Sequence, residues 1–258
     1  VNSGMMQVKQ AIGVVMGAIL GTSVTGWILC LSDLSGGSGW VELLSTATIT
    51  GIVAIVGIVL RMAGKKQSTL AVGNILMGFA VLMFGMSAMS GAVAPLKESE
   101  AFIGILTSFS NPFLGILVGI AFTSILQSAS AAVGILQALA ITGAVTFEVA
   151  FPIIMGIAVG AAVPVLLSAL GANIHGRRTA FVYLLIDVLG VIIWAAVFYT
   201  VNAFVHFSFM TQTMTTVSIA LLNTLFRLAT VVVLAPLIGM LEGFVCFLIP
   251  DRSSANAA

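Results

Sequence analysis

The sequence AFTSILQSASAAVGILQALA, residues 121–140, places three polar side chains in the middle of an apolar stretch. They belong to Gln127, Ser128 and Ser130. At membrane depth, a polar group without a partner costs several kcal/mol. Helix ends, water or a bound solute can supply the partner, and the third possibility would give the protein a function. This stretch is therefore the first candidate for a solute-binding site.

Composition places the stretch in a membrane protein. Hydrophobic residues make up 60% of the 258 residues and charged residues only 7%, with a mean hydropathy of +1.23. Soluble domains carry about 25% charged residues, so a water-soluble globular domain is excluded. The apolar runs are long and unbroken, which predicts helices rather than barrel strands. We expect an all-α polytopic protein, multi-pass in the cell (plasma or inner) membrane. A net charge of +1 indicates no nucleic-acid partner.

Eight apolar segments are candidate membrane spans: residues 10–31, 40–60, 69–94, 101–127, 129–146, 151–170, 179–207 and 217–249. Basic residues gather at 61–66 and 177–178, which predicts that both segments face the cytoplasm. Residues 95–100 and 208–216 are then outside.

The orientation requires an odd number of crossings between residues 100 and 177. Three full helices would satisfy this count. A re-entrant hairpin around Gln127, followed by one crossing, would satisfy it equally.

An internal repeat is the next feature. The sequence IGVVMGAILGTSVTGWIL (residues 12–29) aligns without gaps with FPIIMGIAVGAAVPVLLS (residues 151–168), at an offset of 139 residues (151 minus 12). Both copies contain MGxxxG, whose small residues allow helices to approach closely, so a packing face is the plain interpretation of either copy alone. Two copies in the same context indicate a duplication, which is typical of secondary transporters.

The repeat predicts a division of the chain. We expect residues 1–70 to be the remainder of a first transmembrane repeat, and residues 71–258 to be a second, inverted repeat with re-entrant or broken helices. A first-repeat counterpart of Gln127 would precede residue 1, because 127 is smaller than 139. We therefore expect the chain to be a fragment that lacks the first copy of this stretch.

The motifs resemble those of the type II sodium/phosphate cotransporters and their bacterial relatives, whose signature is a duplicated QSSS motif followed by a glycine-rich GxNxGT motif. The matching stretches are QSASA (127–131), MGAILGTSVT (16–25) and MGIAVG (155–160). Four further stretches are similar: GNILMGFAVLMFGMSAMSGAVAPL (73–96), GILQAL (134–139), LLSALGANIHGRRTA (166–180) and NTLFRLAT (223–230). The resemblance implies inverted repeats in which two QSSS-bearing hairpins meet near the midplane and bind phosphate and sodium.

The resemblance also implies a set of substrate-binding side chains from the two repeats: Gln127, Ser128, Ser130, Thr22, Ser23 and Thr25. Their hydroxyl and amide groups can donate to phosphate oxygens, and their oxygens can accept a sodium ion, which we expect at Ser128, Ser130 and Thr22. Half-helix N-termini add a positive dipole without a fixed charge. No cofactor is expected, and sodium enters only as the coupling ion.

The chain departs from the family pattern at several motif positions. Ala129 stands where the family has a second serine, and Ile19 and Ala158 stand where it has asparagine. The motif threonine is kept as Thr22 but replaced by Ala161 in the second copy. Each change removes a hydrogen-bonding group. A different anion, a low affinity and a degenerate relative are therefore alternatives to phosphate transport.

Two charged residues fall inside predicted spans. Asp187 follows the basic loop at 177–178, Arg227 lies in the last span, and the resembling family has asparagine at both positions. A single charge at membrane depth costs at least about 2.5 to 3.5 kcal/mol. We therefore predict a salt bridge between Asp187 and Arg227, and favour a structural role over a coupling role such as proton binding at Asp187.

The leading hypothesis is a sodium-coupled symporter of phosphate, or of a related inorganic anion, that works by alternating access. Two alternatives stay open: a non-transporting regulatory or assembly relative, and a sodium-independent anion exporter or channel. An enzyme is not expected, because the sequence offers no metal-ligand cluster, catalytic triad or P-loop. The expected partners are phosphate or a related anion, sodium and the lipid bilayer, with a homodimer left open.

Overall fold

The computed structural model describes residues 6–30, 46–93, 95 and 108–250. All the named elements within these residues are helices. Five of the apolar helical segments are long enough to cross a membrane: Val8–Cys30, Gln67–Met89, Phe147–Ser168, Ile174–Val205 and Thr216–Leu248. The chain is therefore an all-α polytopic membrane protein, as its composition predicts.

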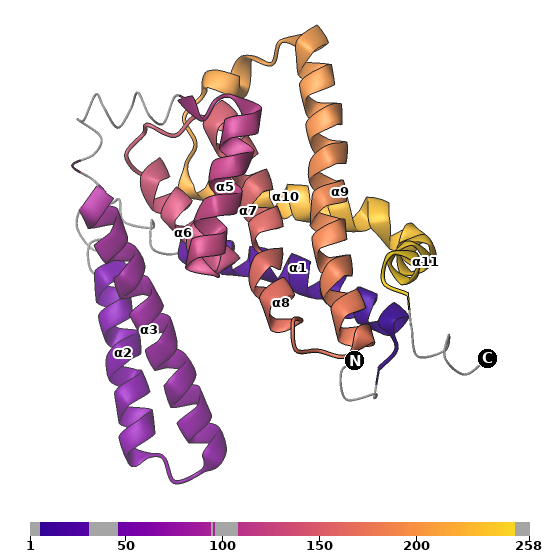
Figure 1. Cartoon of the computed structure of the whole chain (residues 1–258). Helices are drawn as coiled ribbons and strands as arrows, with labels where there is room; N and C mark the ends of the chain where they lie inside the picture. Colours follow the sequence, from indigo (N-terminus) through magenta and orange to yellow (C-terminus); the bar gives the residue numbers. More distant parts are fainter. Residues whose placement is uncertain (1–5, 31–45, 94, 96–107, 251–258) are drawn as a thin grey trace.

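The helices follow in the order α1 (Val8–Cys30), α2 (Thr46–Ala63), α3 (Gln67–Val93), α5 (Pro112–Leu126), α6 (Ala129–Ala140), α7 (Phe147–Gly160), α8 (Ala162–Ser168), α9 (Ile174–Val205), α10 (Thr216–Leu234) and α11 (Ile238–Leu248), with short 3₁₀ turns η4 (Ser208–Thr211) and η5 (Ala235–Leu237). In Figure 1, α1 and α10 pack antiparallel and run across α7 and α9, while the α2–α3 hairpin stands to one side. The predicted repeat boundary at residue 70 lies in the first turn of α3 and stays a prediction.

The two basic turns lie at the same end of the molecule. The turn between α2 and α3, with Lys65 and Lys66, and the start of α9, with Arg177 and Arg178, are both at the lower end of Figure 1. The connection between α9 and α10 is at the upper end. This arrangement agrees with the prediction that both basic segments face one side of the membrane and residues 208–216 the other.

The predicted spans 101–127 and 129–146 differ from the structure, which has two short helices there. α5 has 15 residues and begins at Pro112, because Asn111 Oδ1 accepts a hydrogen bond from Phe113 N at 3.0 Å and caps the helix. α6 has 12 residues and is followed by a turn at Gly143, whose φ is +73°. Residues 101–107 lie outside the described residues.

Neither short helix approaches the length of about 20 residues that a membrane crossing needs. From residue 108 to residue 177, the long apolar segment is Phe147–Ser168, formed by α7 and α8. The described part of this region therefore matches the re-entrant hairpin followed by one crossing, and not three full helices.

Two of the long apolar segments are themselves interrupted. The break between α7 and α8 is at Ala161, three residues before Pro164, and the break between α10 and α11 is the 3₁₀ turn η5, which contains Pro236. Proline removes a backbone donor from the helical ladder, which explains an interruption near each residue. Broken helices are what the resemblance implies for this chain.

α5 packs against α7 through glycine. A Cβ atom on Gly115 would lie 2.7 Å from Pro152 Cγ, and one on Gly119 would lie 2.8 Å from the Cα of Gly156. A Cβ on Gly160 would also meet the backbone of α5, at 2.8 Å. The contact positions advance together along both helices, so α5 and α7 run parallel. The second MGxxxG motif is therefore a packing face.

The first MGxxxG motif has a different environment. Gly17 and Gly21 are exposed on α1, and nothing lies within 4 Å of the position that a Cβ atom would take on either residue. The opposite face of α1 is buried against α9, α10 and α11 through residues such as Ile12, Met16 and Ile19.

α7 is the centre of the fold. In an 18-residue stretch of the Phe147–Ser168 segment, 72% of the residues are buried, against 33% or less in the corresponding stretches of the other long apolar segments. The main core cluster joins α6 and α7 to α9 and α10, through side chains that include Leu136, Ile154, Val191 and Phe226.

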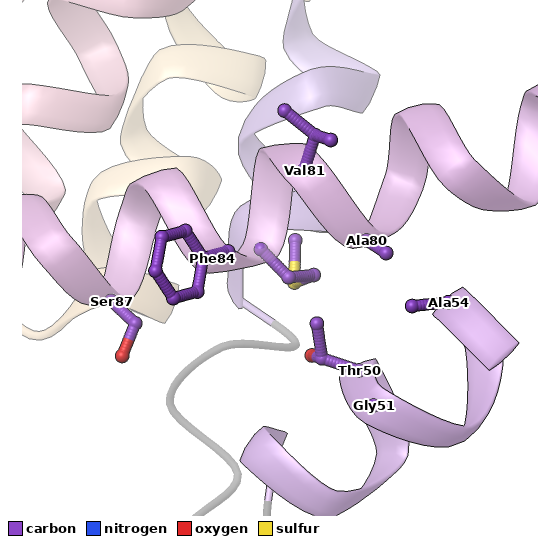
Figure 2. A pocket seen from close by; sticks show the side chains of 8 residues that line it. Thr50, Gly51, Ala54, Ala80, Val81, Phe84 and Ser87 are labelled. Carbon is purple, nitrogen blue, oxygen red and sulfur yellow. The ribbon is translucent and has the colours of Figure 1, made fainter.

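A cavity of about 560 Å³ lies between α2 and α3. In Figure 2, Thr50, Gly51 and Ala54 of α2 face Ala80 and Phe84 of α3. The cavity lining is mostly apolar, and it contains none of the side chains that the sequence predicts to bind substrate. The candidate site therefore lies elsewhere.

The glycine packing of α5 on α7 makes a prediction for stability. Gly156→Ala should lower the free energy of unfolding by about 1 to 3 kcal/mol, because its methyl group meets the α5 backbone and cannot be accommodated by a side-chain rotation. Gly78→Ala, on the exposed face of α3 with nothing within 4 Å, should be neutral or stabilising. Thermal unfolding in detergent measures the difference, and equal melting temperatures would contradict the packing.

Candidate functional site at the turn between α5 and α6

The polar residues of the QSAS stretch form the break between α5 and α6. Gln127 ends α5 in the left-handed conformation, with φ 54° and ψ 24°, and its N–H donates to Thr123 O at 2.8 Å. Its side chain is exposed. Ser128 begins α6, and its Oγ accepts a hydrogen bond from Ala131 N at 3.2 Å. Ser130 is partly buried in the first turn of α6. A non-glycine residue with positive φ is strained, and such strain often marks a functional site.

The N-terminus of α6 is suited to an anion. The first N–H groups of a helix have no acceptor within the helix, and Ser128 Oγ satisfies one of them. The remaining groups and the helix dipole favour negative charge. Residues 112–147 contain no charged side chain, so attraction here comes from N–H, hydroxyl and amide groups alone. A neutral site of this kind can bind an anion without holding it permanently.

The predicted residues of the first repeat lie on the C-terminal half of α1. Thr22 Oγ1 donates to Ile19 O at 2.7 Å, while Thr25 is partly buried. Ser23 is 2% exposed, and its Oγ has no hydrogen-bond partner. A buried hydroxyl without a partner is costly, which makes Ser23 a candidate for contact with a ligand or water.

α1 and α6 touch one turn further along. A Cβ atom on Gly26 would lie 3.8 Å from Val133 Cγ1, and Val133 follows Ser130 by three residues. No hydrogen bond joins the first-repeat set to the QSAS residues. The structure therefore places the two sets on contacting helices, and a single site formed by both sets stays a prediction.

Gln137 is a buried polar residue that the sequence analysis did not select. Its side chain is fully buried, and Nε2 donates to Gly26 O and to Thr216 O, each at 3.0 Å. Cys30 Sγ lies 3.5 Å from the same nitrogen. Gln137 thus fixes α6 to both α1 and α10. The signal that could have identified it is an isolated amide within the apolar stretch GILQAL.

Thr123 is a second residue that the sequence analysis did not select. It is fully buried one turn before Gln127, and its Oγ1 has no hydrogen-bond partner. A Cβ atom on Gly160 would lie 2.8 Å from Thr123 Cβ, so the Thr123 side chain is close to the break between α7 and α8. This hydroxyl offers an oxygen ligand beside two interrupted helices.

The predicted ion pair between Asp187 and Arg227 stays a prediction. The two side chains are 2% and 1% exposed, and they interact electrostatically. Asp187 Oδ2 and Arg227 Nη1 nevertheless have no hydrogen-bond partner. Arg227 Nε donates instead to Asn223 Oδ1 at 3.1 Å, one turn earlier on α10. This hydrogen bond holds the guanidinium along its own helix.

The first-repeat serine belongs to the same buried polar region. Two contacts join α1 to α10 near this serine. A Cβ atom added on Gly26 would lie 3.7 Å from Ala220 Cβ, and Trp27 Nε1 donates to Thr224 Oγ1 at 2.9 Å. Because α1 and α10 are antiparallel, Ser23 lies one turn back on α1, at the level of Asn223 on α10. The centre of the interface between α1, α9 and α10 is therefore polar and charged.

The fold and the site together define a polytopic helical membrane protein with interrupted helices around a buried polar centre, an arrangement typical of secondary transporters. The chain belongs to the Na+/Pi-cotransporter family, whose model matches residues 1–91 and 96–219. No solved structure matches it significantly.

The chain is also similar to curated bacterial proteins. "Uncharacterized protein YqeW" of Bacillus subtilis (strain 168) is 22% identical over 257 residues, which cover 98% of this chain and 77% of the relative. "Putative inorganic phosphate export protein YjbB" of Escherichia coli (strain K12) is 25% identical over 194 residues, which cover 75% of this chain and 33% of the relative. The protein of the same name in Salmonella typhimurium is 25% identical over 74% of this chain. The chain thus spans about a third of the length of the YjbB proteins it matches.

Gln137 allows a test of the junction between α1, α6 and α10. Gln137→Met keeps the volume but removes both hydrogen bonds, and should cost about 1 to 3 kcal/mol of stability. Gln137→Glu should cost more, because a carboxylate would face the two carbonyl oxygens of Gly26 and Thr216. Melting temperatures should fall in the order wild type, Met, Glu, and an unchanged Glu variant would contradict the junction.

Asp187 and Arg227 allow a double-mutant cycle. Arg227→Leu should lower the free energy of unfolding by about 3 to 5 kcal/mol, because it leaves a buried carboxylate without a compensating charge. The folded yield should therefore fall sharply. Asp187→Asn in the same chain should restore most of the yield. Yields are measured by size-exclusion chromatography of tagged protein. A wild-type yield for Arg227→Leu alone would show that the two charges do not stabilise each other.

Proposed function

We propose that the protein is a symporter in the cell (plasma or inner) membrane that couples phosphate, or a related inorganic anion, to sodium by alternating access. The observation that carries the proposal is the turn between α5 and α6. There the N-terminus of α6, the Gln127 amide and the Ser130 hydroxyl lie together in a chain of the Na+/Pi-cotransporter family. The proposal assigns the phosphate oxygens to these donors.

Sodium requires oxygen ligands, and the hydroxyls have lone pairs to spare. Ser128 Oγ uses one lone pair on Ala131 N, and Thr22 uses its hydrogen on Ile19 O. Both oxygens keep a lone pair for a cation. We place sodium at Ser128, Ser130 and Thr22, and add Thr123 Oγ1 because it is buried and has no partner. Neutral ligands suit a coupling ion that must leave again.

A sodium-independent anion exporter is the second candidate. The names of the YjbB relatives favour export, although these proteins are about three times longer than the part that matches. A non-transporting relative is the third, and the departures from the motif favour it. Ile19 and Ala158 stand at the asparagine positions and are both fully buried in the apolar core, so neither offers a polar group to a solute.

Uptake of radiolabelled phosphate into proteoliposomes, with and without an inward sodium gradient, tests the proposal. Gln127→Gly removes a hydrogen-bond donor to phosphate and Ser128→Ala removes an oxygen ligand of sodium, and each should reduce uptake at least about tenfold. Two control variants should destabilise the fold about as much as the two site variants do. His206→Gly removes the other non-glycine residue that has positive φ in the described part of the chain, and Asn111→Ala removes the cap of α5.

The controls separate the site from the helix ends. If the proposal is right, each site variant and its control melt at similar temperatures, and only the site variants lose sodium-dependent uptake. Equal uptake in Ser128→Ala and Asn111→Ala would show that the turn is not part of the substrate site. Uptake that ignores the sodium gradient would favour the exporter, and no uptake of any anion by folded wild-type protein would favour the non-transporting relative.

A further inference from the structure

A cavity of about 360 Å³ lies where the beginnings of α1 and α9 meet α11, and we name it the α1–α9–α11 cavity. It is lined by residues 6–8, by His175 and Arg178 of α9, and by Glu242 and Cys246 of α11. In Figure 1, α11 lies beside the first turns of α1, near the lower end of α9. The volume is within the range of small-molecule sites. The lining contains no side chain of the turn between α5 and α6, so this cavity is separate from the candidate transport site.

The α1–α9–α11 cavity is lined by groups of both charges. His175 and Arg178 are three residues apart on α9, so they lie on one face of that helix. Glu242 and Cys246 are four residues apart on α11 and likewise share a face. His175 is exposed, whereas Arg178 and Glu242 are partly buried. A partly buried charge has lost part of its water, so a ligand of opposite charge can replace that water.

The guanidinium of Arg178 is fixed at one nitrogen. Its Nε donates to Ile249 O at 3.0 Å, which joins the start of α9 to the end of α11. This hydrogen bond uses only one of the N–H groups of the guanidinium, and the two Nη groups are not needed for it. Nη groups donate to phosphate oxygens in a fork geometry, and the ring of His175 adds an N–H donor one turn earlier on α9. The α9 side of the cavity is therefore suited to a phosphate group.

Glu242 lies beside the lipid-facing side of α11. Phe244 and Phe247 are 48% and 81% exposed, while Leu241 and Val245 are buried on another side of the helix. Because a helix turns by about 100° per residue, Glu242 lies between the buried side and the exposed side. In a bilayer, exposed apolar side chains contact lipid tails. The cavity is thus at the edge of the lipid-facing surface, where a lipid headgroup can enter while its acyl chains stay in the bilayer.

The cavity is also at the level of the lipid headgroups. α9 begins at Ile174, so His175 and Arg178 lie at the very start of a 32-residue helix, and α11 ends at Leu248. The ends of membrane-spanning helices lie at the membrane surface, where basic side chains meet lipid phosphates.

We propose that the α1–α9–α11 cavity binds the headgroup of a phospholipid that carries a primary ammonium group, as in phosphatidylethanolamine. The lipid phosphate accepts hydrogen bonds from Arg178 and His175, and the ammonium donates to the carboxylate of Glu242. Glu242 repels a headgroup that carries negative charge alone, and a choline headgroup has no N–H group to donate. The inference goes beyond the proposed transport, because it assigns a lipid to a different part of the fold.

Lipid affinity tests the proposal directly. Native mass spectrometry of the whole protein, released from detergent micelles, measures the binding of phosphatidylethanolamine, phosphatidylcholine and phosphatidylglycerol with identical acyl chains. The wild type should bind phosphatidylethanolamine at least about tenfold more tightly than either other lipid, as expected for one charge-assisted hydrogen bond. Equal affinities for the three lipids would overturn the proposal.

Two variants test the two charges, each beside a matched control. Glu242→Gln should abolish the preference for phosphatidylethanolamine over phosphatidylcholine, and Glu148→Gln, which changes a partly buried carboxylate at the start of α7, should keep it. Arg178→Gln should weaken the binding of phosphatidylethanolamine about tenfold or more. Arg177→Gln should leave it unchanged, although Arg177 is the neighbouring residue and also donates to a backbone carbonyl, Leu170 O, at 3.2 Å. A preference that survives Glu242→Gln, or equal losses in the two arginine variants, would contradict the assignment.

Soluble phosphoethanolamine separates a lipid from a free ligand of the same chemistry. It carries the same two charged groups but no acyl chains, so it should compete with the lipid only weakly. Competition at concentrations equal to that of the lipid would overturn the assignment to a phospholipid. Only folded protein, collected by size-exclusion chromatography, enters the measurement. Sodium and inorganic phosphate are left out, so failure of the proposed transport function leaves this result unaffected.

Discussion

The close approach of α5 to α7 is the constraint on which the rest of the hairpin depends. The contact is formed by glycines, Gly115 and Gly119 on α5 and Gly156 on α7, so the two backbones meet directly. α5 can then end beside α7, and the strained residue Gln127 can turn the chain into α6. An irregular turn at membrane depth is tolerated only where protein or water satisfies its backbone. The packing of α5 and α6 around α7 meets part of this need, and the first N–H groups of α6 remain available to a solute.

The second constraint is polar. Gln137 fixes α6 to α1 and α10 with two hydrogen bonds, and the same pair of helices holds Ser23 and the buried Arg227. Asp187 on α9 is also buried, and it carries the charge opposite to that of the guanidinium. In a medium of low dielectric constant, opposite charges attract strongly even without contact. The hairpin that carries the candidate site is thus attached to a part of the core that contains buried polar and charged side chains.

Much of the fold could be predicted from the sequence, and the exceptions have local causes. The spans 10–31, 69–94 and 179–207 match α1, α3 and α9, because long apolar runs bounded by polar loops define helices directly. The start of α5 was missed because the signal is small, the dipeptide Asn111-Pro112 inside an apolar run. The hydrogen bond from Arg227 to Asn223, one turn earlier on α10, was missed because the sequence does not show which partner a buried guanidinium binds. Gln137 was missed because sequence does not show what a side chain faces. The position of the candidate site was readable from its motif, but its partners across the fold were not.

Hydrogen–deuterium exchange of the first turn of α6 tests the central claim most directly. The protein is reconstituted in lipid nanodiscs, and the exchange of the backbone amides of residues 128–132 is followed with and without phosphate in the presence of sodium. The account predicts slower exchange at these amides when both ions are present, because a bound anion accepts hydrogen bonds from the N–H groups at the N-terminus of α6. Phosphate that binds and leaves these amides unchanged, while protecting another element, would contradict the account.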